Sequence, residues 1–176
     1  MGLDITYCEN IKLYEGKVDE DGEPMINDYV RVYENPDFKN HCEHNSGYYT
    51  TNYSNDFRAG SYSGYGYFRN KLAGIMGYEY SMKDHSFLGK TYQFKDHVIN
   101  AGDPFEELIN FSDCEGAIGT IYSKKLYEDF KNNHQFIFDQ LGLDDDHDQD
   151  TKFVEVYVLF MEAFRVASNN GVVIFH

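Results

Sequence analysis

The stretch TKFVEVYVLFMEAFRVASNNGVVIFH (residues 151–176) contains a helix pattern followed at once by a strand pattern. Its first part predicts an amphipathic helix over residues 151–168, because large apolar side chains recur at helical spacing. These side chains are Phe153, Tyr157, Phe160, Met161 and Phe164. Asn170 and Gly171 end the helix pattern, and the remaining VVIFH is typical of a buried strand. The two patterns together indicate a fold that packs helices against a sheet.

Further strand and helix patterns precede this stretch. Strands are expected at residues 3–7, 11–14, 29–33, 92–94 and 97–99. Helices are expected from about Ser63 to Gly77, over residues 104–111 and after Ser123. Asp103 and Glu106 form a capping box for the second of these helices, and Ser123 is expected to cap the third.

The polar residues 37–55 predict a long loop, or a loop with one short edge strand. Strands and helices do not alternate as βαβ units. We therefore expect a single compact α+β domain over residues 1–176, with an antiparallel or mixed sheet and three to four helices.

The chain is strongly acidic. Its 30 acidic and 15 basic residues give a formal net charge of −15. Such a charge argues against general binding to the nucleic acid backbone or to an anionic membrane. It favours a partner protein with a basic or nucleic-acid-binding surface. Solubility alone is the simpler explanation of the same charge.

Targeting signals and cysteine pairs are not evident in the sequence. The three cysteines have no spacing that is typical of a disulfide framework, and we find no signal peptide pattern. No apolar run approaches the roughly 20 residues that a membrane-spanning helix needs. We therefore expect a cytoplasmic protein.

The segment RAGSYSGYGYFRNKLAG (residues 58–74) is the first candidate site. Small residues that lead into a helix N-terminus present amide donors to an anion, and arginine forks suit phosphate. The candidate ligand-binding residues are Arg58, Ser61, Tyr62, Ser63, Tyr65 and Arg69. In the alternative interpretation, the two arginines pair with acidic residues while Tyr65 and Phe68 pack in the core.

The segment LDDDHDQDTKFVE (residues 143–155) partly matches a calcium-binding loop. Its candidate ligands are Asp144, Asp146, Asp148, Asp150 and Glu155. Gln149, however, occupies the position at which the sharp turn of such a loop needs glycine. Aspartates before a helix also complement the helix dipole without any metal. We expect no cofactor, with calcium or another divalent metal as the alternative.

The segment NFSDCEGAIG (residues 110–119) is the candidate catalytic segment if the protein is an enzyme. Cys114 is a potential nucleophile, and Asp113 and Glu115 are potential ligands of a divalent metal. The alternative is a polar loop between two helices, in which Gly116 and Gly119 make the turns.

Three stretches of the chain resemble a family of uncharacterised bacteriophage and prophage proteins. They are MGLDITYCENIKL, FRAGSYSGYGYFRNKLA and ELINFSDCEGAIGTIYSKKL, and a weaker likeness continues into EAFRVASNNGVVIFH. The resemblance implies a phage origin and a site of action in the host cytoplasm, but it brings no known activity or catalytic residues.

Three functional hypotheses follow, and we expect a binding protein rather than an enzyme. The first is a phage accessory protein that inhibits a host defence component through its acidic surface. The second is a small-molecule module that sequesters a nucleotide or a nucleotide-derived signal. The third is a metal-dependent hydrolase or nuclease.

Overall fold

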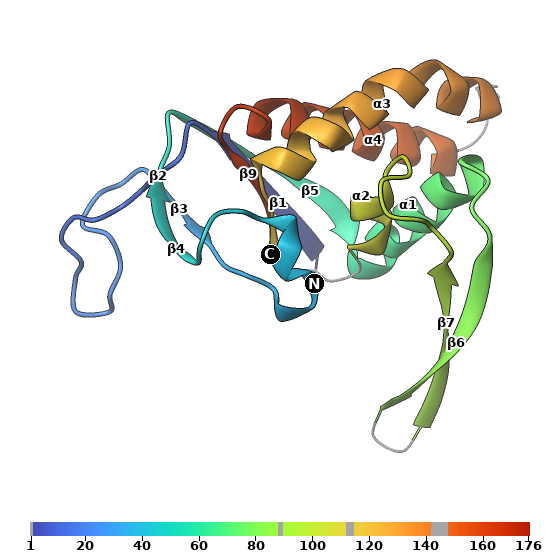
Figure 1. The fold of residues 1–176 in the computed structure, drawn as a ribbon, viewed down its shortest axis with the longest axis horizontal. Coiled ribbons are helices and arrows are strands. Elements are labelled where there is room, and N and C mark those ends of the chain that lie inside the picture. Colours follow the sequence, from blue (N-terminus) through green and yellow to red (C-terminus); the bar gives the residue numbers. More distant parts are fainter. Residues whose placement is uncertain (1, 88–89, 112–114, 142–147) are drawn as a thin grey trace.

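The computed structural model describes residues 2–87, 90–111, 115–141 and 148–176, with the backbone alone for 83–87, 90–95, 148 and 149 (Figure 1). Its largest sheet has four strands in the order β5-β1-β9-β8, and all neighbouring strands are antiparallel. The strands are β1 (Gly2–Glu9), β5 (Tyr53–Ser61), β8 (Gly116–Ile118) and β9 (Val172–Phe175). The predicted α+β fold with an antiparallel sheet is thereby confirmed.

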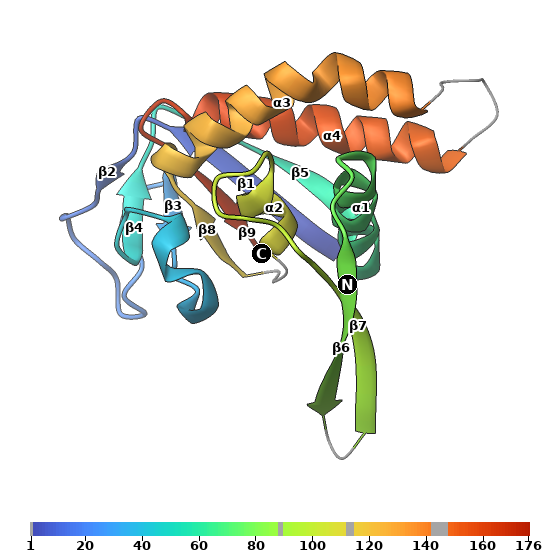
Figure 2. The ribbon, with the colours of Figure 1, turned by 45° about the vertical axis from the view of Figure 1, so that its right-hand side comes forward.

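Helices cover one face of this main sheet (Figures 1 and 2). They are α1 (Tyr62–Ile75), α2 (Glu106–Asn110), α3 (Thr120–Leu141) and α4 (Asp148–Ala167). Between helices and sheet lies an aromatic core. The ring of Phe160 on α4 lies 5.2 Å from Phe57, 5.3 Å from Phe68 and 6.2 Å from Phe175, measured between ring centres. Among the described residues, no helix combines the length and apolar character that crossing a membrane requires.

A smaller sheet covers part of the opposite face. Its strands are β2 (Lys12–Leu13), β3 (Tyr29–Val32) and β4 (Gly47–Thr50), in the order β2-β4-β3. Val30, Val32 and Tyr49 of this sheet pack against Cys8 and Ile174 of the main sheet. The 3-10 helix η1 (Pro36–His41) follows β3 and begins at the predicted Asn35-Pro36 stop.

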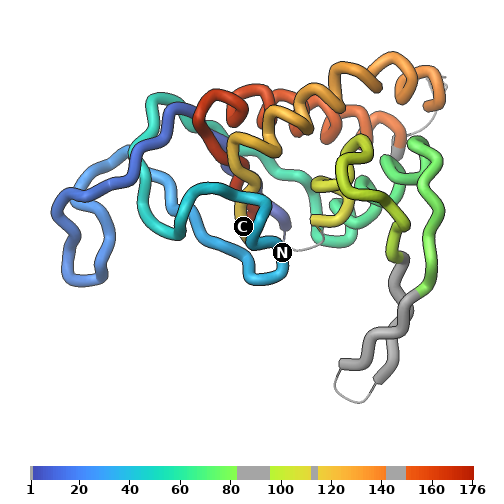
Figure 3. Tube along the Cα trace, viewed as in Figure 1, coloured from blue at the N-terminus to red at the C-terminus, as the bar shows by residue number. Residues whose placement is uncertain are grey.

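A long hairpin projects from the body (Figure 2). It consists of β6 (Tyr80–Phe87) and β7 (Lys90–His97), which pair in register from Tyr80 with His97 to Phe87 with Lys90. At its base, His97 Nε2 lies 2.8 Å from Asn70 Oδ1 of α1. We call β6 and β7 together the arm. Figure 3 shows the traces of α3 and α4 running side by side on the helix side of the molecule.

Several predicted elements are confirmed with small shifts, namely β1, β3, α1, α4 and β9. The loop prediction for residues 37–55 is wrong in part, because the segment contains η1, β4 and the start of β5. Residues 53–56 at the start of β5 are all exposed, and they show no apolar alternation. A polar strand at the end of a sheet carries little of the pattern by which strands are identified in a sequence.

The predicted caps of two helices are also wrong. Residue Phe105, with φ of 62°, precedes α2, and no side chain caps this helix. Burial decides this conformation, because the Phe105 ring is fully buried 4.9 Å from Phe130 and its N–H donates to Asp129. Ser123 lies inside α3, which begins at Thr120, and its side chain is buried.

Candidate small-molecule pocket

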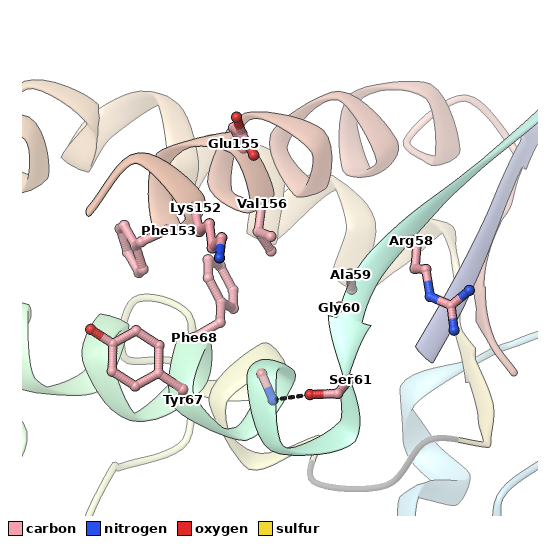
Figure 4. A pocket seen from close by; sticks show the side chains of 11 residues that line it. Arg58, Ala59, Gly60, Ser61, Tyr67, Phe68, Lys152, Phe153, Glu155 and Val156 are labelled. Atoms are coloured by element: carbon pink, nitrogen blue, oxygen red, sulfur yellow. Dashed lines mark hydrogen bonds between the residues drawn. The ribbon is translucent and has the colours of Figure 1, made fainter. Parts of the chain in front are cut away.

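A pocket of about 510 Å³ opens between α1, α4 and the end of β5 (Figure 4). Seven of its eleven lining residues belong to residues 58–68, and the other four belong to residues 152–156. Ligand pockets in proteins typically have volumes of about 300–1,000 Å³. The first candidate segment of the sequence therefore lines a pocket of suitable size.

A bulged strand-to-helix turn forms one wall of the pocket. Leu3 pairs with Gly60 while Asp4 pairs with Arg58, so Ala59 is the extra residue. Gly60 has φ of +106°, which residues with a side chain rarely adopt, and it allows β5 to continue directly into α1. The first turn of α1 thereby faces the pocket.

Ser61 caps this turn. Its Oγ accepts a hydrogen bond from the N–H of Gly64 at 3.0 Å and lies 2.9 Å from Ser63 Oγ. The amides of a first helical turn have no intrahelical acceptor, and the helix dipole places partial positive charge there. A 14-residue helix that starts at the pocket is therefore a favourable neighbour for an anionic group.

Aromatic rings line the pocket between the two helices. Phe68 and Phe153 are each only 2% exposed, with ring centres 5.1 Å apart, whereas Tyr67 is 44% exposed. Lys71 of α1 forms an ion pair with Asp150 of α4, and its Nζ lies 5.5 Å from the centre of the Phe153 ring. Burial lowers the pKa of Lys71. This pair joins α1 to α4 beside the pocket.

The charged side chains at the pocket differ in direction (Figure 4). Lys152 points into it, Glu155 points away from it, and Arg58 lies on the other side of β5.

A Cβ added to Gly64 would meet, among the described residues, only Ser61 Oγ at 3.3 Å. This distance is tight, so a side chain at Gly64 would crowd the Ser61 cap as well as enter the pocket.

The structure separates the residues that the sequence grouped as one ligand site. Arg58 and Ser61 line the pocket, but the Arg58 guanidinium lies near Asp4, with Nε 3.9 Å from Oδ1. Tyr65 is buried, and its hydroxyl donates a hydrogen bond to Phe111 O. The guanidinium of Arg69 donates a hydrogen bond to Ile109 O at 2.6 Å. The two arginine side chains thus lie on opposite sides of the main sheet.

Two further members of that group lie at the start of α1. Tyr62 is 42% exposed, and Ser63 bonds to Ser61, but neither lines the pocket. The sequence offered Tyr67, with Tyr62 and Tyr65, as a residue to stack a base, and the structure places it at the pocket. Sequence reasoning missed Gly64 and the two α4 residues Lys152 and Phe153. The glycines and tyrosines of the first segment were a signal for the residues on the α1 side of the pocket. No local pattern in the sequence indicates that α4 packs beside α1.

The catalytic and metal candidates fall largely outside the described residues. Asp113, Cys114, Asp144 and Asp146 lie outside them, and for Asp148 only its place in α4 is described. The Asp150 carboxylate pairs with Lys71, while Glu155 and Glu115 are exposed. Within the described part of the chain, no group of three His, Cys, Asp or Glu side chains is placed to hold a metal ion. The hydrolase and calcium hypotheses stay predictions.

The two described cysteines are poor nucleophiles. Burial raises the pKa of Cys8 to about 11 and that of Cys42 to about 11. Both thiols are therefore protonated at neutral pH, whereas the thiolate is the reactive form.

Comparison with known proteins identifies no relative: no protein-family model, curated protein or solved structure matches this chain. The ligand of the pocket must therefore be inferred from the chemistry of the residues that line it.

Proposed function

We propose that the protein binds a small anionic ligand with a flat ring system, a nucleotide or a nucleotide-derived signal, between α1 and α4. The observation that carries the proposal is that the Lys152 side chain, the first turn of α1 and the Tyr67 side chain line one pocket. An ammonium group and a helix N-terminus both favour phosphate, and an aromatic face favours a base. The protein would act by sequestering its ligand.

Each wall of the pocket has a defined part in this binding. The phosphate lies between Lys152 and the N-terminal turn of α1, and the ring of the ligand packs on Tyr67. The buried rings of Phe68 and Phe153 supply an apolar wall that excludes water.

Thermal melting tests the proposal, with ATP, ADP, cyclic mononucleotides, cyclic dinucleotides and ADP-ribose as probes. A ligand at 100 times its Kd stabilises the folded state by about 2.7 kcal/mol. We expect at least one probe to raise the melting temperature of the protein and to have no such effect on Lys152→Gln. The control is Lys131→Gln, because Lys131 is a half-exposed lysine on α3 that pairs with Glu128. If none of the probes shifts melting, the proposal fails.

Two glycines of α1 provide a second, matched test. Gly64 lines the pocket, whereas Gly66 does not, and a Cβ added at Gly66 meets no described atom within 4 Å. Gly64→Leu should fill the pocket and abolish binding, while Gly66→Leu should leave binding intact. Equal affinities of the two variants for the best probe would place the ligand elsewhere.

Inhibition of a host defence component stays a second candidate, which the acidic β2–β3 connection supports. Residues 15–28 contain six acidic residues and one lysine. Asp19 Oδ1 accepts hydrogen bonds from the backbone N–H of Asp21 and Glu23, so this acidic turn has a defined shape. Val18 and Met25 beside it are 51% and 65% exposed. An ordered acidic surface with apolar side chains suits a basic protein partner.

A retention experiment tests this second candidate. The immobilised protein should retain nucleic-acid-binding host proteins that soluble heparin displaces, because heparin presents a comparable negative charge. The triple variant Glu20→Gln, Asp21→Asn, Glu23→Gln should lose them. Retention that is insensitive both to heparin and to this variant would contradict the candidate.

A further inference from the structure

Two long β-structures of the molecule have a strand edge without a neighbouring strand among the described residues. The first is β5, which ends the main sheet, with β1 on one side only. We call its other side the β5 edge. A nine-residue edge strand presents backbone N–H and C=O groups that favour pairing with a further strand. Residues 53–56 of this edge are all exposed.

The second is the arm. Its strands of eight residues pair with one another and project away from the main sheet (Figure 2). Tyr80 and Met82 near its base are 55% and 50% exposed. A two-stranded hairpin without further cover is marginally stable in water. The arm thus has the structure of an element that gains its stability from a partner.

Charge indicates which partner surface the arm fits. Residues 80–97 contain three lysines and two aspartates, a net charge of +1, which leaves −16 for the rest of the chain. Two acidic bodies repel one another, and a contact that includes the arm reduces this repulsion. The acidic residue of β5 itself is Asp56, which is exposed.

The β5 edge also offers apolar surface. Tyr53 is 43% exposed and its ring centre lies 6.4 Å from that of Tyr7. Strand addition to an edge combines such side-chain contacts with main-chain hydrogen bonds. The arm strands and β5 have nearly the same length, which allows pairing along most of the edge.

We propose that two copies of the chain form a dimer in which the arm of each copy pairs along the β5 edge of the other. The contact is reciprocal, as expected for a two-fold symmetric dimer. It covers the β5 edge and one outer edge of each arm, and it brings the weakly basic arm to an acidic body. Residues 58–61 of β5 also line the pocket, but the dimer requires no ligand there.

Sedimentation equilibrium of the full chain tests the proposal. We expect the mass of a dimer at micromolar concentration. A variant without the arm, in which Asn-Gly replaces residues 80–97, should be a monomer. The deletion is feasible because the N–H of Val98 donates to Glu79 O at 2.9 Å, so the two ends already lie side by side. An Asn-Gly turn suits such a junction.

A second variant addresses the edge. Tyr53→Lys with Ser54→Lys removes an aromatic contact and places two positive charges where the arm would pair, and it should also be a monomer. The control is Ile121→Ser, which changes a 64% exposed residue on α3 and should stay a dimer. A cooperative melting transition would show that each variant is folded, and the loss of the dimer should lower its melting temperature.

Mixing the two monomeric variants gives the decisive result. The arm-deleted chain keeps its β5 edge, and the edge variant keeps its arm, so the mixture should form a heterodimer with one of the two contacts. A monomeric wild-type chain, or a dimer that persists without the arm, would overturn the proposal.

Discussion

The two faces of the main sheet are covered in different ways. Val173 and Phe175 of β9 enter the aromatic core beneath the helices, while Val172 and Ile174 of the same strand face the smaller sheet. All four residues are buried. The helix side is large and rich in aromatic rings, whereas the other side is smaller and mainly aliphatic.

On the face of the main sheet opposite the helices, the smaller sheet does not reach as far as β5. Along β5, Phe57 and Ala59 are buried under the helices, whereas Asp56 and Arg58 on the opposite face are exposed. The central strand β9 is therefore apolar on both faces, and the outer strand β5 is apolar on one face over half its length. Most of the apolar surface that stabilises the fold is therefore buried on the helix side of the main sheet.

The largest expected effect is a cavity in the aromatic core. Phe160→Ala removes a fully buried ring that contacts rings from β5, α1 and β9, and should lower the free energy of unfolding by about 3–5 kcal/mol. Urea denaturation measures this loss. Phe136→Ala, which truncates a 47% exposed ring on α3, is the control and should cost far less.

A matching cavity on the other face should cost less. Val32→Ala, at a position that is 1% exposed in the smaller sheet, should lower the free energy of unfolding by about 2 kcal/mol. Denaturation under the same conditions allows direct comparison. A loss as large as that of Phe160→Ala would show that both faces stabilise the fold equally.

One hydrogen bond between the two sheets gives a smaller effect. The hydroxyl of Tyr33, next to β3, donates to Phe175 O of β9 at 2.6 Å. Tyr33→Phe removes the donor and keeps the ring, so the free energy of unfolding should fall by about 1 kcal/mol. An unchanged midpoint of denaturation would mean that this bond does not hold the sheets together.

The smallest effect at neutral pH is expected for His41, at the end of η1. Its ring centre lies 5.4 Å from Phe38 and 5.3 Å from Tyr122. Burial lowers the pKa of His41 from its ordinary value of 6.5, with Glu106 and Glu107 acting in the opposite direction. As the pH falls below about 6.5, the unfolded chain therefore takes up a proton before the folded one does.

The free energy of unfolding of the wild type should accordingly decrease below this pH and level off beneath the lowered pKa. His41→Phe retains an aromatic ring without the titrating group. Its stability should be close to that of the wild type at pH 7.5 and higher at pH 5. Parallel curves for both proteins over this range would contradict the assignment.

Much of the fold on the helix side could be predicted from local pattern. The Phe68 and Leu72 positions of α1 and the Phe153, Tyr157 and Phe160 positions of α4 repeat at helical spacing because one face of each helix is buried. The strand β5 escaped prediction because six of its nine residues are exposed, and β4 because its four residues are half-buried or buried without any alternation. The helix caps were mispredicted where a tertiary contact, as at Phe105, overrode the local preference.

The candidate site shows the same limit. Glycine, serine and tyrosine at residues 58–68 pointed to one wall of the pocket. Ser61, predicted as a ligand-binding residue, lines it and caps α1. The opposite wall depends on Lys152 and Phe153, which lie far away in the sequence. The packing of α4 on α1, through Phe153 on Phe68 and Asp150 with Lys71, brings the walls together.

By itself, the sequence determined the net charge, the amphipathic faces of α1 and α4, the buried strands β1 and β9 and therefore the α+β class. These properties depend on residues that are near one another in the chain, where periodicity reports burial directly. Only the tertiary structure decided the pocket, the direction of Arg58 away from it, the uncovered β5 edge and the projecting arm. Each of these depends on which distant segments meet, and long-range packing leaves no periodic pattern in the chain.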